Sequence, residues 1–244
     1  PRVLRRASRW PLAYAVYDFG PAPFEDGGPS TDLMSAVPAD LDGDGLLELV
    51  VSDKGPQHVY ERDGATWVDR APALGATADP NPDGEQMVGF AVGVPDLDAD
   101  GWADLVITAS RDGADQQAPY PVLLRNTGAG SLEPSGWLDG ASHDEQGLAV
   151  ADLDRDGRPD LLFGGVDEPP RLLWNQLDAG GSLRVELVGT VSNREGVGAV
   201  VTVEAGGRDR VQRAFGGGNS FGYGESALVF GLGGERAEAV RVRW

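Results

Sequence analysis

The sequence contains no cysteine and only two histidines, His58 and His143. Without cysteine, disulfide bonds and thiolate metal sites are excluded. Neither histidine has a second histidine at a metal-binding spacing, so we expect both at the surface. No apolar run approaches the roughly 18 residues of a transmembrane helix, and membrane insertion is therefore not expected.

Aromatic residues make up only 7% of the chain, whereas its 36 glycines and 17 prolines favour a turn-rich β protein. With 244 residues, the chain is long enough for one large or two small domains. The formal net charge is -19, and nucleic acid or an anionic membrane would be repelled by such a surface. The expected partners are therefore divalent cations and basic molecules, and nucleic acid is not among them.

Three acidic loops recur at intervals of 56 residues: the first loop (40–48), the second loop (96–104) and the third loop (152–160). Positions are counted from the first aspartate of each loop. One cation can be bound by the side chains at positions 1, 3, 5 and 9 together with the backbone carbonyl at position 7, and glycine at position 6 permits the sharp turn. A hard cation with oxygen ligands fits best, so the sequence predicts about three Ca²⁺ ions. The predicted ligands are Asp40, Asp42, Asp44, Leu46 and Glu48; Asp96, Asp98, Asp100, Trp102 and Asp104; and Asp152, Asp154, Asp156, Arg158 and Asp160.

Two other interpretations of these loops are weaker. An EF-hand needs flanking helices and a bidentate glutamate at position 12, where this chain has Val51, Ile107 and Phe163. Ordinary Asp/Gly turns would not explain why leucine also recurs at positions 2 and 10 of every loop. We expect the cation to be part of the fold, because the four acidic side chains of an empty loop repel one another.

Short apolar runs precede and follow each loop, and a further strand-like run comes later in each unit. The predicted strands beside the loops are 35–37 and 49–51 in the first unit, 90–92 and 105–107 in the second, and 147–150 and 161–163 in the third. The later runs, each a strand with its following turn, are 59–64, 122–128 and 171–175. The runs after the loops suit strands that are buried on both faces. Repeated β-meanders without a long helical pattern are typical of a propeller or a similar stacked array.

The loops and their flanking strands resemble FG-GAP or VCBS repeats, which are β-propeller blades with calcium-binding DxDxDGxxD loops. Such repeats are found in integrin α-subunits and in many secreted bacterial proteins. The resemblance covers about residues 30–180, with Glu48 in place of aspartate as one departure. It implies an all-β fold in which calcium-binding blades form a β-propeller-like array.

From about Gly181 the acidic loops stop, and alternating apolar and polar residues predict half-buried strands over 183–187, 200–203, 228–230 and 240–244. With the segments 192–198, 216–220 and 230–233, these runs resemble the small UnbV/ASPIC domain. That domain typically follows VCBS repeats in proteins similar to cartilage acidic protein. We therefore expect a repeat region over 1–180, with three clear repeats and a partial N-terminal blade as an option, and a small β domain over 181–244.

No segment predicts an active site with the partners that catalysis needs. The run 218–222 matches the G-x-S-x-G pattern with Ser220 as nucleophile, but no histidine follows it in the chain. The obvious carboxylate pairs for glycoside hydrolysis already belong to the metal loops. The chain is therefore not expected to be an enzyme. Trp102 is expected to expose its ring to solvent from position 7 of the second loop.

These features predict a calcium-binding extracellular or surface module for binding or adhesion, with an unknown protein or glycan partner. An extracellular, periplasmic or cell-surface location follows because weak calcium modules, with dissociation constants of about 10⁻⁴ to 10⁻³ M, are filled outside cells. The alternative is a secreted polysaccharide-acting enzyme or its accessory carbohydrate-binding module. Since propellers close with about four to eight blades, three repeats leave three options: a fragment of a larger propeller, a ring completed by the C-terminal strands, or an open array that forms an oligomer.

Overall fold

The computed structural model describes residues 2–6, 14–18, 33–53, 55–64, 66–76, 87–111, 121–135, 145–165, 169–178, 180–191, 193–215 and 222–244. Regular structure in these ranges consists of short strands and one single-turn helix, α1 (Ala71–Leu74). No helix in them is long and apolar enough to cross a membrane. The prediction of an all-β fold is confirmed.

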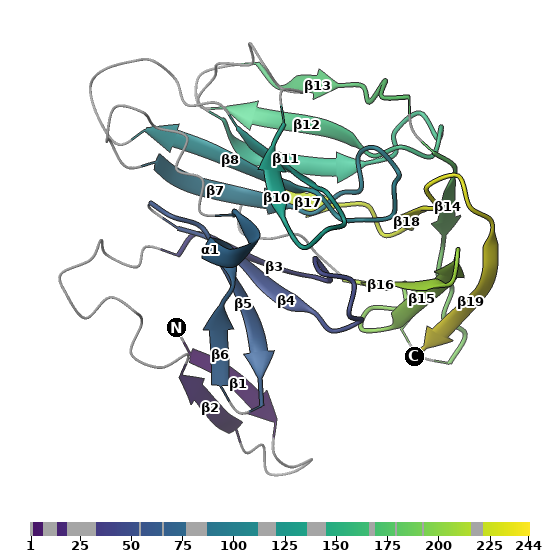
Figure 1. Cartoon of the computed structure of the whole chain (residues 1–244), viewed down its shortest axis with the longest axis horizontal. Coiled ribbons are helices and arrows are strands. Elements are labelled where there is room, and N and C mark those ends of the chain that lie inside the picture. The colour runs from purple at the N-terminus through teal and green to yellow at the C-terminus, as the bar shows by residue number, and fades with distance from the viewer. Residues whose placement is uncertain are drawn as a thin grey trace.

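Three four-stranded sheets, which we call blades 1, 2 and 3, follow one another along the chain (Figure 1). In each blade, the predicted strands around the acidic loop form an antiparallel hairpin. Blade 1 is β3 (Ser35–Ala39), β4 (Glu48–Ser52), β5 (His58–Asp63) and β6 (Thr66–Asp69); blade 2 is β7 (Met87–Gly93), β8 (Leu105–Arg111), β9 (Val122–Asn126) and β10 (Leu132–Pro134); blade 3 is β11 (Glu145–Ala151), β12 (Asp160–Gly165), β13 (Arg171–Leu173) and β17 (Gly222–Gly224). The sequence did not predict β6, β10 or β17, and β17 pairs in parallel with β11 from far along the chain.

Apolar side chains fill the space between successive blades. β3 and β4 contact β7, and β7 and β8 contact β11. One buried cluster, which includes Val50, Leu105 and Ile107, joins blades 1 and 2. A second cluster, which includes Val106 and Phe163, joins blades 2 and 3. Each interface therefore buries large aliphatic side chains, each of which contributes about 1.5–3 kcal/mol relative to exposure.

Blade 3 has a face that no further blade covers within the described ranges. On blade 2, Leu97, Val106 and Leu123 are at most 4% exposed, because blade 3 packs over them. The corresponding positions of blade 3 are 50%, 38% and 38% exposed at Leu153, Leu162 and Leu172. The described strands thus form an open array and no closed propeller. The exposure of Leu162 also shows that the strand after the third loop is not buried on both faces, which corrects the expectation for that strand.

The C-terminal strands form two small sheets at one side of the blades (Figure 1). β14 (Ser182–Val185) pairs with β18 (Leu228–Gly231), and β16 (Arg208–Arg213), β15 (Val200–Ala205) and β19 (Ala237–Arg243) form a three-stranded antiparallel sheet. Val201, Val203 and Phe230 belong to their shared apolar core. The predicted C-terminal strands are confirmed, and β16 is added to them. Before blade 1, β1 (Arg2–Arg6) and β2 (Tyr14–Asp18) form a separate hairpin.

Two asparagines tie successive blades together. Asn126, at the end of β9, is buried, and its Nδ2 donates to the carbonyl of Leu41 in the first loop at 2.7 Å and to the carbonyl of Ala103 at 3.1 Å. Asn175, just after β13, repeats this contact with the carbonyl of Leu97 in the second loop at 2.8 Å. Blades 2 and 3 therefore each make a hydrogen bond to the acidic loop of the preceding blade.

His58 is buried, which corrects the expectation that it lies at the surface. Its Nδ1 lies 2.7 Å from Oδ2 of Asp69, and its Nε2 lies 3.6 Å from Oδ2 of Asp53. Burial alone would lower the pKa of the imidazole, but the attraction of the two carboxylates outweighs burial and raises the pKa of His58 to about 9. The protonated ring thus links the ends of β4 and β6 through β5. His143 lies outside the described residues.

Replacing Asn126→Ala should lower the free energy of unfolding by about 1–3 kcal/mol, because the buried carbonyls of Leu41 and Ala103 lose their donor. Urea unfolding in the presence of calcium would measure this loss. Asn175→Ala should act in the same direction at the next interface. The exposed Gln176→Ala is the control, with an expected change below about 0.5 kcal/mol. An Asn126→Ala protein as stable as the control would contradict the inter-blade role.

His58 should make stability fall with rising pH. Because its folded pKa of about 9 lies above the model value of 6.5, its contribution is complete below pH 6.5 and is lost as pH rises through 9. The difference in unfolding free energy between wild type and His58→Gln should therefore shrink by up to about 3 kcal/mol over this range. Denaturant unfolding at saturating calcium would measure it, and a difference that does not vary with pH would refute the protonated assignment.

Candidate metal site

The three acidic loops occupy the same place in the three blades, in the turn between the first two strands. The strand that follows begins at or next to position 9, and this brings the last carboxylate of each loop close to the first. In every loop, one carboxylate oxygen from each of positions 1, 3 and 9 lies within 4.8 Å of the other two. These groups are Asp40, Asp42 and Glu48; Asp96, Asp98 and Asp104; and Asp152, Asp154 and Asp160.

Three hydrogen bonds recur at the same positions of every loop. The carboxylate at position 1 accepts from the backbone N–H of position 6, at 3.1, 2.8 and 3.1 Å in the three loops. The carboxylate at position 5 accepts from the N–H of position 7, at 2.7, 2.9 and 3.0 Å. The carboxylate at position 9 accepts from the N–H of position 2, at 2.7, 2.9 and 2.9 Å. In each loop, backbone N–H groups are therefore hydrogen-bonded to carboxylates of the same loop.

Two backbone positions of each loop have positive φ. Position 6 is glycine throughout, with φ of 84°, 89° and 88° at Gly45, Gly101 and Gly157, in agreement with the predicted need for glycine. Position 4 also has positive φ, including at the non-glycine residues Ala99 (51°) and Arg155 (61°). A residue with a side chain in this region costs about 1 kcal/mol or more. The contacts of the loop, rather than local preference, therefore hold position 4 in place.

Every loop also buries a carboxylate oxygen that has no hydrogen-bond partner. These oxygens are Oε1 of Glu48, Oδ1 of Asp96, Oδ1 of Asp98 and Oδ1 of Asp152. Glu48 and Asp152 are only 3% and 5% exposed. Because burial removes water from a charged oxygen without replacing it, such an atom is costly unless another group binds it. The donor set is all oxygen, which suits a hard cation.

The same burial makes the negative charges of the loops unfavourable. Burial, reinforced by the neighbouring carboxylates, raises the pKa of Glu48 and the pKa of Asp96 to about 8. It raises the pKa of Asp104 to about 7 and the pKa of Asp40 to about 6. A cation placed among these oxygens would favour the ionised forms.

The three loops differ in the arginine side chains that form ion pairs with their carboxylates. In the second loop, Arg125 donates to Asp98 at 2.6 Å and to Asp100 at 3.2 Å. In the third loop, Arg158 pairs with Asp156. Within the described residues, no arginine or lysine forms an ion pair with a carboxylate of the first loop. The first loop is therefore the least compensated of the three.

The structure brings together the predicted side-chain ligands at positions 1, 3 and 9. The side chains at position 5 lie outside these groups and accept from the N–H of position 7; they are Asp44, Asp100 and Asp156. The carbonyl groups at position 7, on Leu46, Trp102 and Arg158, remain predicted ligands. The G-x-S-x-G run with Ser220 lies outside the described residues.

Trp102 does not project into solvent, which corrects the expectation for its ring. The residue is half-buried, and its ring lies so close to Gly43 of the first loop and to Gly128 that neither glycine has room for a Cβ atom. The guanidinium group of Arg208 lies over the ring, 3.7 Å from its centroid. Trp102 therefore packs the second loop against the first loop and against β16.

Sequence reasoning missed the residues that support the loops from outside. The backbone N–H groups of Asn126 and Asn175 donate to the second oxygen of Asp104 and Asp160, at 2.8 and 2.9 Å. Asn126 is the last residue of β9 and Asn175 follows shortly after β13, and this similar position after the third strand is a signal that the sequence contains. Glu225 instead accepts from the N–H of Asp152 at 2.8 Å across 73 residues, which no local pattern indicates.

Comparison with known proteins agrees with this geometry. A family model described as FG-GAP-like repeat matches residues 96–163, which include the second and third acidic loops. A second family model, described as ASPIC and UnbV, matches residues 189–244. No curated protein matches the chain significantly. The chain thus carries an FG-GAP-like repeat followed by a C-terminal ASPIC and UnbV domain, as the sequence motifs predicted.

Proposed function

We propose that the chain is a calcium-binding module in which each acidic loop holds one Ca²⁺ ion. The observation that supports this proposal best is the buried, unpartnered carboxylate oxygen found in every loop. The carboxylates at positions 1, 3 and 9 would hold the ion, with the position 7 carbonyl and the position 5 side chain as further ligands. The ion supplies positive charge to a site that otherwise concentrates negative charge away from water.

Calcium suits these loops better than other common cations. Neither cysteine nor histidine contributes to the groups, so a site for a soft or borderline metal has no support. Magnesium demands a near-ideal octahedron and keeps several waters, whereas calcium accepts six to eight oxygens in flexible geometry. The groups combine side chains from both ends of a turn whose backbone is fixed, and this favours the more tolerant ion.

In this proposal the ion is structural, and the module binds or adheres to a protein or glycan partner outside the cell or at its surface. Weak calcium sites of extracellular modules fill at the millimolar concentrations found there. The side chains of the loops are engaged in backbone hydrogen bonds, which leaves them poorly suited to act as general acids or bases. We therefore propose a binding role in preference to catalysis.

Calcium should raise the melting temperature strongly relative to EDTA. At a free concentration of 100 times the dissociation constant, each site adds about 2.7 kcal/mol, so three sites add about 8 kcal/mol. For a chain of this size the increase corresponds to a shift on the order of 15–30 °C. Differential scanning calorimetry would measure it, with equimolar magnesium as the control. A melting temperature that is the same in calcium and in EDTA would overturn the proposal.

Replacing Asp98→Asn should reduce the calcium stoichiometry from about three to about two. Asp98 contributes both a clustered carboxylate and an unpartnered buried oxygen to the second loop, and the amide keeps its size while removing the charge. Equilibrium dialysis would give the stoichiometry. The matched control is Asp178→Asn, an exposed aspartate outside the three loops, which should retain all sites. An unchanged stoichiometry in Asp98→Asn would remove the second loop from the list of sites.

A further inference from the structure

The C-terminal strands pack against the ends of the blades where the three acidic loops lie. Val211 of β16 approaches Gly45 of the first loop, and Ser182 of β14 lies directly against Gly157 of the third loop. Arg208 covers Trp102 of the second loop. The three loops, which are far apart in sequence, therefore share one neighbour: the C-terminal domain formed by β14, β15, β16, β18 and β19.

The polar contacts to the second loop are made to its backbone. Nη2 of Arg208 donates to the carbonyl of Gly101 at 2.9 Å, and the N–H of Gly233 donates to the carbonyl of Ala99 at 2.7 Å. Ala99 is the position 4 residue that is held at positive φ, and Gly101 is the position 6 glycine. The C-terminal domain thus binds carbonyl groups whose direction depends on the conformation of the loop.

The third loop is held in a similar way. Oε1 of Glu225 accepts the N–H of Asp152, which is position 1 of the loop, at 2.8 Å. The other oxygen of Glu225 forms an ion pair with Arg184 of β14 at 2.5 Å, and Arg184 also lies 3.9 Å from Oδ2 of Asp152. Next to Glu225, β17 pairs in parallel with β11. A shift of Asp152 would therefore disturb contacts to both β14 and the segment that carries β17.

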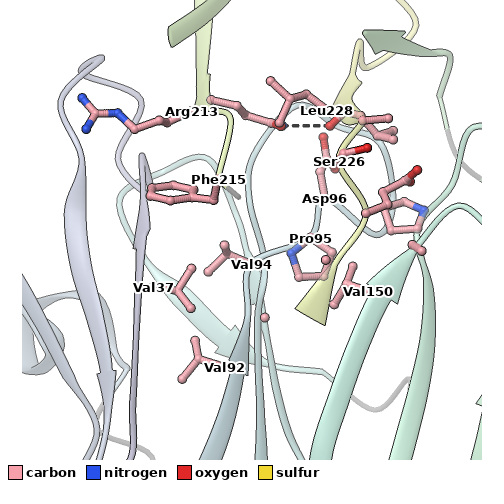
Figure 2. A pocket seen from close by; sticks show the side chains of 18 of the residues that line it. Val37, Val92, Val94, Pro95, Asp96, Val150, Arg213, Phe215, Ser226 and Leu228 are labelled. Atoms are coloured by element: carbon pink, nitrogen blue, oxygen red, sulfur yellow. Dashed lines mark hydrogen bonds between the residues drawn. The ribbon is translucent and has the colours of Figure 1, made fainter. Parts of the chain in front are cut away.

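Part of the interface between the blades and the C-terminal strands is hollow. A cavity of about 320 Å³ lies between the first strands of the three blades and the segment from β16 to β18. Figure 2 shows Val37, Val92 and Val150 of the blades on one side and Phe215 and Leu228 on the other. Side chains that face this cavity have no protein neighbour on that side and lack the contacts that a packed core would give them. The contacts at the loops therefore carry a larger share of the docking free energy than they would in a solid interface.

We propose that docking of the C-terminal domain and cation binding by the second and third loops are coupled, with Arg208 as a positioning residue for the second loop. The inference rests on the proposed calcium binding. An occupied loop presents the carbonyls of Ala99 and Gly101 and the N–H of Asp152 in the arrangement that the domain binds. By linkage, contacts that favour this arrangement must also favour the bound cation by the same factor.

Charge alone predicts the opposite sign. Arg208 places a guanidinium group beside the second loop, and a positive charge there opposes the binding of a cation. Removal of Arg208 should therefore tighten calcium binding if its charge dominates, and weaken calcium binding if its positioning contacts dominate. The stacking on Trp102 and the bond to Gly101 favour the second outcome. Trp102 carries the position 7 carbonyl that is a predicted ligand, and Gly101 immediately precedes it, so both contacts position the backbone next to that ligand.

The test combines two measurements on the whole chain. Amide hydrogen exchange, followed by mass spectrometry across a calcium titration, should show protection of β16 and β18 rising together with occupancy of the loops. Isothermal titration should show that Arg208→Ala weakens one of the calcium-binding steps about tenfold. The control is Arg241→Ala, which removes the same charge from β19; its guanidinium group pairs with Glu204 and Asp209, away from the loops. Its calcium affinity should match wild type.

The outcomes separate the coupling from calcium binding itself. A wild-type chain that binds no calcium overturns the proposed function, and the coupling with it. If the wild-type chain binds three ions, two results would each overturn the coupling alone. In the first, hydrogen exchange at β16 and β18 does not respond to calcium. In the second, Arg208→Ala binds calcium at least as tightly as Arg241→Ala. If Arg208→Ala does not fold, Arg184→Ala provides the same comparison at the third loop, because it removes a guanidinium group that lies 3.9 Å from Oδ2 of Asp152 and pairs with Glu225.

Discussion

The rest of this structure depends on the burial of carboxylates in the turn of the first hairpin of each blade. Each loop uses its carboxylates to satisfy backbone N–H groups that a tight turn would otherwise leave unpaired, and the same three bonds recur in all copies. This arrangement leaves other oxygens of the same groups buried and unpartnered. The backbone N–H groups of the turn are therefore hydrogen-bonded, but the buried negative charge is unfavourable. The proposed cation would offset that charge.

The loops also lie where the larger contacts of the molecule meet. Asn126 and Asn175 connect each of blades 2 and 3 to the loop of the preceding blade. Arg208 of the C-terminal domain contacts Gly101 of the second loop, and Glu225 contacts Asp152 of the third loop. A change in the conformation of the second loop would therefore disturb its own hairpin, blade 3 and the docked domain together. Because these contacts meet at the loops, a cation bound there would affect the packing of the blades and of the C-terminal domain.

The sequence predicted most strands because their patterns are local. The runs at 105–107 and 122–128 read as strands because short apolar segments stand beside turn residues, and β8 and β9 confirm them. β17 was missed because Gly222–Gly224 has no strand pattern and pairs only through its distant neighbour β11. His58 and Trp102 were misplaced for a similar reason. The partners that bury them, Asp69 for the histidine and Arg208 for the tryptophan, come from other strands.

The sequence by itself determined the repeat, its strands, the acidic loops and the glycine at position 6, because ligand spacing and turn geometry operate within about ten residues. Only the tertiary structure decided which carboxylate oxygens lose their water, which asparagines join the blades, and where the C-terminal domain docks. Those features arise from segments that meet across 73 to 107 residues of chain, and burial at such a distance leaves no local pattern. For the same reason the sequence could not predict the exposed face of blade 3. Leu153 and Leu97 occupy the same position of the repeat, but a further blade packs over Leu97 and none of the described blades packs over Leu153.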